Sequence, residues 1–386
     1  MLPSQMEISV YELRNLVTGR AIEGETMLLN MGPQHPSTHG VLRLLLELDG
    51  EKVVNCVPDI GFLHTGIEKN MEAKPYMQSL VMTDRMDYLN TVGNNLLYSL
   101  AIEKLVELDV PPRAQAIRVI LVELQRIASH LVWLGTHALD LAAMSVFLYC
   151  FRERELILDI LEMCSGQRMM TSYIRPGGLW RDVPQGFEEA VQQFVHMLPG
   201  RIAQYESMLT RNPLFLDRTR KIGVISAEQA VRWGLTGPPL RATGIPLDLR
   251  KAQPYSGYEQ YEFDVPTAHN GDVYDRYIVR MEEMRQSLRI IEQALEQMPE
   301  GPVLPEKLPR RLRVPPGEVY MRTENPRGEY GIYLVSKGGE KPYRLKIRAS
   351  CFCNLMALKK MTVGHYVADA VTILGSVDIV LGEVDR

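Results

Sequence analysis

Apolar and polar residues alternate near the N-terminus of the chain, which predicts a β-hairpin. Every second position from 42 to 48 is a leucine, and the polar residues Arg43 and Glu47 stand among them. This spacing places all four leucines on one face of a strand. Asp49-Gly50 then favours a tight turn into Val53-Val54. We therefore expect two paired strands with one buried face.

From about Pro75 the apolar residues follow the spacing of helices. One helix is expected over 94–109, and Pro111-Pro112 begins a helical run that we expect to reach about residue 162. Further helices are predicted over 187–210, 227–234, 274–298 and, with breaks, 356–382. The segment 237–272 is rich in Pro, Gly and Tyr, which indicates a loop.

Strand-like runs return between residues 314 and 349, with 331–336 and 343–347 joined by a turn at 337–340. The whole pattern predicts an α+β fold that is predominantly helical. We expect an N-terminal β-rich region (1–74), a helical core (75–313) and a C-terminal β plus helix region (314–386) that packs back on the core.

Composition narrows the class of protein. The 386 residues are 46% hydrophobic and 23% charged, and the net charge of -4 gives no electrostatic reason to bind nucleic acid. The most apolar stretch, 131–151, contains His137 and Asp140. A charge in the middle of a bilayer is costly, so this stretch fits a buried helix better than a membrane span. No signal peptide is evident, and any membrane contact is expected to be indirect.

The number and spacing of cysteines and glycines argue against zinc, iron–sulfur and nucleotide sites. Five scattered cysteines fit a reducing, cytoplasmic setting, and only Cys351 and Cys353 are close in sequence. Two thiols without a second pair cannot complete a zinc or iron–sulfur site, so packing is the favoured interpretation. The sequence has no phosphate-binding glycine loop, so we expect no bound nucleotide.

Two short segments carry the most suggestive chemistry. Residues 32–40, GPQHPSTHG, form a Pro- and Gly-rich loop with two imidazoles, and residues 83–90, TDRMDYLN, place Tyr88 in a charged, helix-like run. An imidazole and a phenol together could hydrogen-bond a quinone head group and supply the two protons that its reduction needs. On the residues alone, His39 serves equally well as a structural loop residue.

Asp140 lies in an apolar helical stretch, where a carboxylate is costly unless it is paired. Its partner is either an arginine or a histidine whose affinity for a proton it would raise. His130, Trp133 and His137 share one helix face, and we expect them to be core residues rather than metal ligands. Three turns that combine Arg with Gly and Pro (173–178, 240–244 and 324–329) predict guanidinium groups bound to carboxylates or carbonyls.

Taken together, these segments resemble the 49 kDa-type (D-type) subunit of the proton-pumping NADH–quinone oxidoreductase, respiratory complex I. The matching segments run from about residue 30 to the last residue: GPQHPSTHG, GFLHTGIEKNMEAKPY, DRMDYLN, YIRPGG, GPPLRATG with DLRKAQPYSGYEQYEFDVP, GDVYDRYIVRMEEMRQSLRIIEQ, PRGEYGIYLVSKGGEKPYRLKIRA and LGEVDR.

That family is similar to the large subunit of nickel–iron hydrogenases, which hold their metals with R-x-C-x-x-C and D-P-C-x-x-C segments. Residues 85–90 resemble the first segment and 378–383 the second, but Asp87, Asn90, Val380 and Glu383 stand in the place of the four thiols. Without soft ligands the nickel–iron centre cannot be built. Residues 324–328 resemble the hydrogenase E-x-P-R-G segment and would be a remnant of the scaffold.

The resemblance implies a hydrogenase-large-subunit-like helical core whose vacated metal pocket receives the quinone head group. Tyr88 and His39 would be the head-group ligands, and Asp140 the acidic partner of that histidine. His35 would be a loop-shaping residue. Thr65 stands where many relatives carry Arg, so no role of that Arg is carried over.

The resemblance also implies the surroundings of the chain. It would bind no metal or nucleotide itself, and the electrons would come from a [4Fe-4S] cluster in an adjacent subunit. Expected partners are the terminal iron–sulfur subunit (B type), the 30 kDa-type subunit (C type) and the membrane subunit of H type. The chain would be a peripheral protein on the cytoplasmic side of the bacterial cell membrane.

Three alternatives remain open at this point. The first is a hydrogenase-type enzyme with bound metals, and the second is a non-catalytic scaffold that bridges the iron–sulfur subunit to the membrane arm. The third keeps the quinone site but takes electrons from ferredoxin or another donor in place of NADH.

Overall fold

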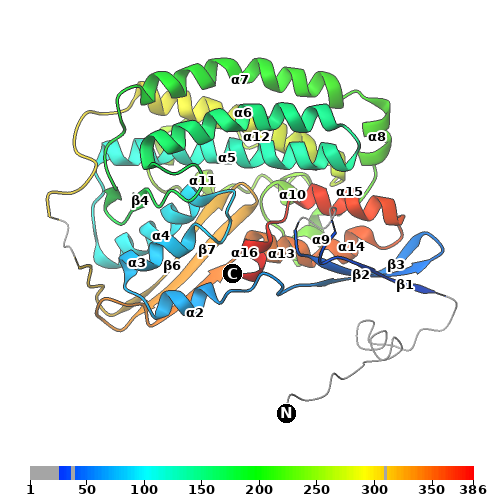
Figure 1. Ribbon diagram of the computed structural model, residues 1–386, viewed down its shortest axis with the longest axis horizontal. Coiled ribbons are helices and arrows are strands. Elements are labelled where there is room, and N and C mark those ends of the chain that lie inside the picture. The colour runs from blue at the N-terminus through cyan, green and yellow to red at the C-terminus, as the bar shows by residue number, and fades with distance from the viewer. Residues whose placement is uncertain (1–25, 36–39, 308–310) are drawn as a thin grey trace, which may run out of the picture.

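The computed structural model describes residues 26–35, 40–307 and 311–386. The four longest helices pack together in the upper part of the molecule, here called the helix layer, with α12 behind α6, and shorter helices and two three-stranded sheets lie beneath them (Figure 1). The long helices are α5 (Pro112–Asp140), α6 (Met144–Ser165), α7 (Phe187–Leu209) and α12 (Val273–Glu296). The predicted α+β fold with a helical majority is confirmed.

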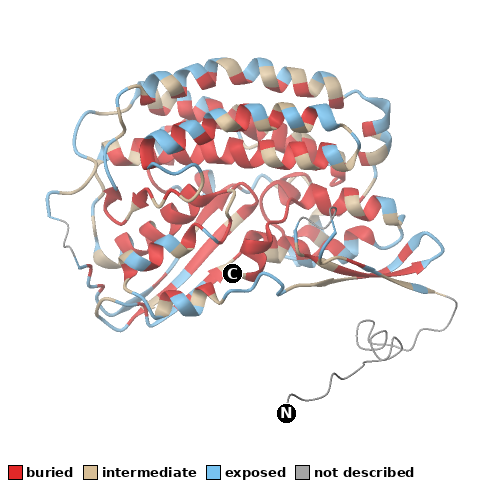
Figure 2. Cartoon of the chain, viewed as in Figure 1, coloured by how far each residue is buried: buried red, intermediate tan, exposed pale blue. Residues whose placement is uncertain are grey.

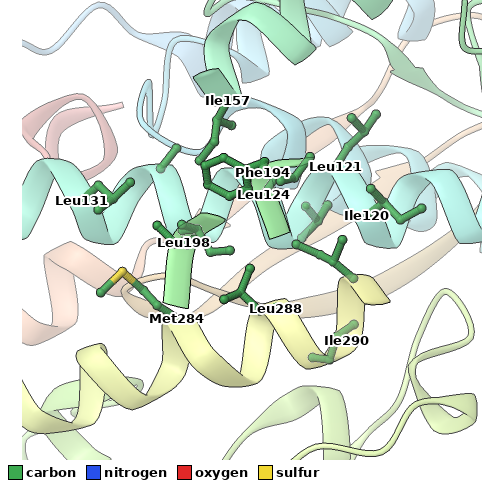
Figure 3. Close-up of a cluster of buried hydrophobic side chains, with 14 of the residues drawn as sticks. Ile120, Leu121, Leu124, Leu131, Ile157, Phe194, Leu198, Met284, Leu288 and Ile290 are labelled. Carbon is green, nitrogen blue, oxygen red and sulfur yellow. The ribbon is translucent and has the colours of Figure 1, made fainter. Parts of the chain in front are cut away.

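Apolar side chains hold the helix layer together. α5 faces both the other long helices and the elements beneath them, and it is buried along most of its length (Figure 2). Leu124 of α5, Ile157 of α6, Phe194 of α7 and Met284 of α12 meet in one cluster (Figure 3). Complete burial of such a side chain contributes roughly 1.5–3 kcal/mol, so this cluster fixes how the helices pack.

The predicted run from Pro112 to about residue 162 is not one helix. α5 ends at Asp140, and α6 begins at Met144 and packs back along α5. Ala142 has a left-handed backbone, with φ at 64°, which breaks the helix and reverses the chain. The correction matters for function because Asp140 thereby lies at a helix end.

The N-terminal sheet confirms the predicted hairpin. β1 (Met27–Met31), β2 (Arg43–Asp49) and β3 (Lys52–Asp59) are antiparallel in that order, and Gly50 lies in the turn between β2 and β3. The leucines at 42, 44, 46 and 48 are at most 2% exposed. They pack on the C-terminal helices α14 (Leu358–Thr362) and α15 (Val367–Val377).

The second sheet carries a hairpin into the centre of the molecule. β6 (Gly317–Asn325), β7 (Gly328–Ser336) and β8 (Arg344–Arg348) are antiparallel, and β6 was not among the predicted strands. Asn325 pairs with Gly328, so Pro326 and Arg327 form the hairpin tip. α4 (Thr91–Val106) packs on both strands of this hairpin.

The remaining elements are short. They are α2 (Ile67–Glu72), α3 (Tyr76–Thr83), β4 (Ile174–Arg175), β5 (Gly178–Leu179), α8 (Pro213–Thr219), α9 (Ala227–Arg232), α10 (Pro238–Arg241), α11 (Leu249–Ala252), the 3-10 turn η2 (Tyr258–Gln260), α13 (Ser350–Met356) and α16 (Leu381–Asp385). The helices predicted near 187–210, 227–234 and 274–298 are confirmed. Within the described part of the chain, no helix is long and apolar enough to cross a membrane.

Candidate functional site

The segment that carries Tyr88 is a series of turns. α3 ends at Thr83 and α4 begins at Thr91, so the prediction of a helix-like run over 83–90 is wrong beyond Thr83. The side-chain amide of Asn94 donates to the carbonyls of Thr83 and Asp87, both at 2.9 Å. Asp87 itself accepts the backbone N–H of Leu89 at 3.1 Å. Hydrogen bonds from side chains thus replace those of a helix and fix the chain in a series of turns.

Segments 85–90 and 378–383 meet at Gly382. A Cβ at this glycine would lie 2.5 Å from the Met86 carbonyl oxygen and 3.1 Å from Cδ1 of Tyr88. No side chain fits at such a distance from backbone, so glycine allows the close approach. The half-buried Tyr88 is therefore placed against the C-terminal segment.

Arg327 joins the same two segments by charge. Its guanidinium lies 2.9 Å from Asp87 Oδ2 and 3.2 Å from Asp378 Oδ1, and all three side chains are buried. The prediction that the arginine of 324–328 binds carboxylates is confirmed. The Arg327 guanidinium therefore cross-links segments 85–90 and 378–383.

The thiol and carboxylate beside Arg327 make hydrogen bonds within the chain. Glu383 accepts from Ser350 Oγ at 2.7 Å and from the Cys351 N–H at 3.0 Å. Cys351 Sγ accepts from the Val380 N–H at 3.3 Å. Within the described residues, no group of three or more His, Cys, Asp or Glu side chains could hold a metal ion.

The histidine loop ends beside Leu381. His35 and Gly40 form an antiparallel bridge, and the Cβ position of Gly40 is 3.9 Å from Leu381 Cδ1. Leu381 directly precedes Gly382, the residue that contacts Tyr88. His39 lies outside the described residues. His35 lines a pocket between β1 and α15.

Asp140 lies against α15. A Cβ at Gly375 would be 3.4 Å from Asp140 Oδ2 and 2.8 Å from Nδ1 of His137. The Trp133 indole donates to the Gly375 carbonyl at 2.8 Å, and His137 stacks on that indole. His130, Trp133 and His137 are buried, as predicted for core residues. The proximity of His137 to Asp140 was not predicted, although their i, i+3 spacing on one helix could have suggested it.

Burial makes two carboxyl groups near this site titrate close to neutral pH. It raises the pKa of Asp87 to about 7; Arg327 opposes the shift, and Glu383 and Asp378 add to it. Burial also raises the pKa of Asp140 to about 6. The pKa of Tyr88 is raised by burial and by the charge of Asp87. The phenol therefore stays protonated at neutral pH and can donate a hydrogen bond.

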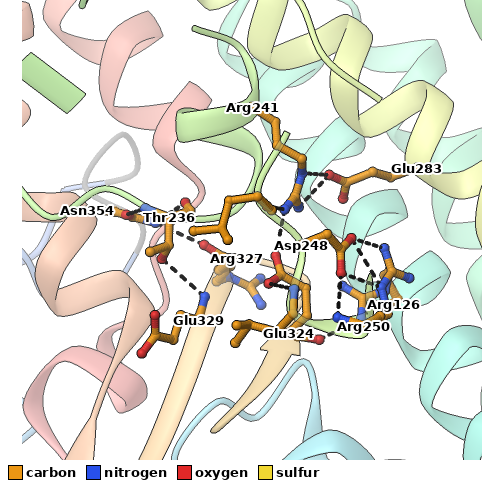
Figure 4. A network of polar contacts seen from close by, with 12 residues as sticks. Arg126, Thr236, Arg241, Asp248, Arg250, Glu283, Glu324, Arg327, Glu329 and Asn354 are labelled. Atoms are coloured by element: carbon orange, nitrogen blue, oxygen red, sulfur yellow. Dashed lines mark hydrogen bonds and ion pairs between the residues drawn. The ribbon is translucent and has the colours of Figure 1, made fainter. Parts of the chain in front are cut away.

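A second buried network holds the hairpin that presents Arg327 (Figure 4). Arg241 lies 2.7 Å from Glu283 of α12 and 2.7 Å from Glu324 of β6. Arg250 pairs with Asp248 at 2.6 Å and with Glu123 of α5 at 3.0 Å. The prediction of a bound guanidinium in 240–244 is confirmed. The network ties the hairpin to the helix layer.

Comparisons of the sequence with known proteins identify the family of the chain. Residues 140–386 match the family described as "Respiratory-chain NADH dehydrogenase, 49 Kd subunit". The chain is 56% identical to a D-type subunit of the NADH-quinone oxidoreductase of Chloroflexus aurantiacus over 397 residues, covering 96% of each protein. It is 55% identical to a D-type subunit from Roseiflexus sp. (strain RS-1), covering 99% of this chain and 100% of the relative.

A relative of slightly lower identity gives the same result. The D-type subunit of the NADH-quinone oxidoreductase of Citrifermentans bemidjiense is 51% identical over 386 residues, covering 94% of this chain and 99% of the relative. Both the identity and the coverage are far above what chance would give. The chain therefore belongs to the family of the 49 kDa subunit of respiratory-chain NADH dehydrogenases.

Proposed function

We propose that this chain is the quinone-binding subunit of a proton-translocating NADH–quinone oxidoreductase. Tyr88 and His39 bind the quinone head group, and Asp140 is the acidic partner of His39. The relatives are named as D-type subunits of NADH-quinone oxidoreductases, which supports the reaction class.

One observation carries the proposal: a single C-terminal segment, 375–382, touches all three parts of the candidate site. Gly375 lies beside Asp140, Leu381 beside Gly40 at the end of the histidine loop, and Gly382 beside Tyr88. The fold therefore brings a phenol, a carboxylate and the end of an imidazole-bearing loop to one stretch of backbone.

The proposed chemistry is proton donation during reduction. A quinone becomes basic at both oxygens as it gains two electrons, and it needs two protons. The Tyr88 hydroxyl gives one, and an imidazolium at His39, with an ordinary pKa of about 6.5, gives the other. Asp140 favours the charged imidazolium before transfer and faces a neutral imidazole afterwards. That change of charge is the proposed first step toward the proton pumps.

The proposed setting is an assembled complex. The electrons arrive from an iron–sulfur cluster in the neighbouring B-type subunit, and the C-type and membrane H-type subunits complete the surroundings. The chain lies on the cytoplasmic side of the membrane as a peripheral subunit, and the membrane contact passes through its partners.

Tyr88→Phe tests the proposal in the assembled complex. The variant keeps the ring and removes the proton donor, so quinone reduction should fall by roughly 100-fold or more, while electron transfer to an artificial acceptor upstream stays intact. Tyr330→Phe is a matched control, because its buried hydroxyl contacts the Met86 sulfur in the same region and has no part in the proposed chemistry. It should leave the rate unchanged.

Photolabelling with a quinone analogue separates a site from a scaffold. Label on the segments around Tyr88 and His39 supports the site. Label confined to partner subunits would show that this chain is a scaffold, and a wild-type rate in Tyr88→Phe would show that Tyr88 is not a head-group ligand.

A further inference from the structure

A groove lies between α6 and α7, where α7 is the uppermost helix in Figure 1 and α6 lies below it. Its volume is about 380 Å³, which is within the size range of binding pockets in proteins. Six of the residues that line it are apolar: Leu156, Ile160 and Met163 of α6, and Ala190, Phe194 and Met197 of α7. Tyr88 and Asp140 do not line this groove, so what binds here is independent of the proposed function.

The lining residues of both helices have the spacing of a helix-packing face. α6 lines the groove at positions 156, 159, 160 and 163, and α7 lines it at positions 190, 193, 194 and 197. Each set follows the spacing i, i+3, i+4, i+7, with which a helix turns one side toward a neighbouring helix. Seven residues of rise make the groove about 10 Å long, or two helical turns. Its shape therefore suits two turns of a third helix.

Large apolar side chains are exposed at the mouth of the groove. Ile160 and Phe194 form its floor and are each 3% exposed, whereas Leu156 is 44% exposed and Met163 is 37% exposed. Exposed apolar side chains that gather beside a hollow mark an interaction surface. The flexible thioethers of Met163 and Met197 can adapt to the shape of a partner. A helix that fills the groove would take these side chains out of water.

Contacts between α6 and α7 show which of their ends meet. Glu153 of α6 accepts a hydrogen bond from the Tyr205 hydroxyl at 2.6 Å and lies 3.3 Å from Arg201, and both partners belong to α7. The two helices therefore run antiparallel, because these contacts come before the groove on α6 and after it on α7. The other end of the groove lies between the last turn of α6 and the first turn of α7.

That other end is negatively charged. Three exposed acids lie there: Glu162 in the last turn of α6, and Glu188 and Glu189 in the first turn of α7. Glu155 and Asp159 share Arg168. Arg181 adds a second guanidinium, which donates to the Cys164 carbonyl at 2.9 Å. Five acids against two arginines leave this end negative, and a negative surface favours a cationic partner.

We propose that this groove docks an amphipathic helix of a partner protein. The apolar side chains of that helix, spaced i, i+3 or i+4, and i+7, fill the groove, and its lysine or arginine side chains lie over Glu162, Glu188 and Glu189. Charge selects this occupant. A second copy of this chain has a net charge of -4, and residues 1–25 contain four Glu and two Arg, so neither offers an excess of positive charge.

Site-specific photocross-linking identifies the occupant. An amino acid with a benzophenone side chain takes the place of Gln193, an exposed residue that lines the groove, in the full chain within the assembled complex. The expected product joins position 193 to one peptide of a partner protein, and this peptide has the apolar spacing and the basic side chains of the proposed helix. Cross-links to a second copy of this chain, to residues 1–25 or to no protein at all would overturn the proposal.

Gln192 is the matched control for the cross-link. It is also an exposed glutamine of α7, but it does not line the groove, because a helix turns by about 100° per residue. The same probe at position 192 should leave the partner unlabelled. Equal labelling of the partner from both positions would show that it does not lie in the groove, which contradicts the proposal.

A synthetic peptide with the cross-linked sequence measures the apolar contribution by its Kd for the purified full chain. Leu156→Gln should weaken binding roughly tenfold or more, because it places an amide at the mouth of the groove. Leu148→Gln is the matched control: Leu148 lies on the same helix, is 56% exposed and does not line the groove. Its substitution should leave the Kd unchanged. Equal losses in the two variants would refute docking in the groove.

Salt tests the contribution of charge to the same binding. The affinity of the wild-type chain for the peptide should fall as the salt concentration rises, because salt screens exposed charges. The double variant Glu162→Gln/Glu189→Gln should bind roughly threefold more weakly at low salt and respond less to added salt. A Kd that does not change with salt in the wild-type chain would show that charge does not select the occupant and would overturn the proposal.

Discussion

The molecule contains two buried clusters of charged side chains, and they differ in the number of arginines that pair with the carboxylates. In the network of Figure 4, Arg126, Arg241 and Arg250 surround the carboxylates. At the candidate site, a single guanidinium, that of Arg327, pairs with both Asp87 and Asp378. The first cluster is rich in cations and the second is poor in them.

The pKa values follow this difference. Burial alone would raise the pKa of every one of these acids, but Arg126 and Arg250 lower the pKa of Glu123 to about 2 in spite of it. Arg250 likewise brings the pKa of Asp248 to about 2 against the effect of burial. Asp87, which shares one arginine with Asp378, has its pKa raised to about 7. Glu324, which shares Arg241 with Glu283, is the exception within the network, with a raised pKa.

The comparison teaches which buried acids can exchange protons near neutral pH. A carboxylate surrounded by arginines stays charged and acts as structure, whereas one with few cations can take up a proton during a reaction. Both clusters are connected through the β6–β7 hairpin, because Glu324 anchors its end and Arg327 forms its tip. The arginine network of Figure 4, the rigid cluster, therefore positions the titratable cluster around Arg327.

The largest expected effect comes from breaking the rigid cluster. Arg241→Met would leave Glu283 and Glu324 buried with one cation fewer, which should destabilise the chain by about 3–5 kcal/mol. Arg289→Met is the control: Arg289 lies on the same helix as Glu283, and its ion pairs with Glu262 and Asp264 are exposed. It should cost less than about 1 kcal/mol. Denaturant unfolding of the purified chain measures both, and equal losses would contradict the comparison.

A second experiment sharpens the difference in titration. Asp87 has a folded pKa near 7, above the value of about 3.9 in an unfolded chain, so the folded state binds more protons between these values. Its contribution to stability therefore falls as pH rises through that window. Asp87→Asn removes this loss, so the stability of the variant relative to wild type should improve between about pH 5 and 7, by up to about 1.4 kcal/mol per pH unit.

Asp248→Asn is the matched control for that titration. With a folded pKa near 2, Asp248 is charged in both folded and unfolded states throughout about pH 5–7, so the stability of its variant relative to wild type should not change with pH. Unfolding free energies measured across that range decide the matter. Parallel curves for the two variants would show that the clusters do not differ in titration.

The sequence predicted elements where local pattern decides the structure. The alternating leucines of β2 revealed its buried face because the period of a strand is two residues. The break between α5 and α6 was missed because residues 141–143, Leu-Ala-Ala, are good helix formers without Gly or Pro. Ala142 adopts its left-handed backbone because α6 packs back on α5. Residues 141–143 carry no signal of that tertiary contact.

The residues of the site likewise divide into those that the sequence indicated and those that only the fold shows. Tyr88 and Asp140 were singled out by residue type and by the family resemblance, and the structure brings both to one C-terminal segment. The partners within the arginine network could not be identified from the sequence because they are remote: Arg250 and Glu123 are 127 residues apart. No local spacing signals such a pair, and only the folded arrangement of α5, α11 and β6 shows it.

The smallest expected effect is a difference in stability between two Gly→Ala variants, one at the site and one in the helix layer. Apart from its chain neighbours and the backbone of its own helix, Gly200 in α7 has no described atom within 4 Å of its Cβ position, so Gly200→Ala should stabilise the chain by about 0.5–1 kcal/mol through helix propensity. Gly375 in α15 is also helical, but an added methyl group would meet His137 Nδ1 at 2.8 Å and Asp140 Oδ2 at 3.4 Å. Gly375→Ala should therefore lose that gain and destabilise by about 1 kcal/mol.

The same pair of variants tests the chemistry. Gly375→Ala should lower quinone reduction by the assembled complex, because the methyl group pushes on the His137 ring beside Asp140, while Gly200→Ala keeps the wild-type rate. If Gly375→Ala is as stable and as active as Gly200→Ala, the contact between α15 and the end of α5 is loose, and Asp140 is not held in place for the chemistry proposed for it.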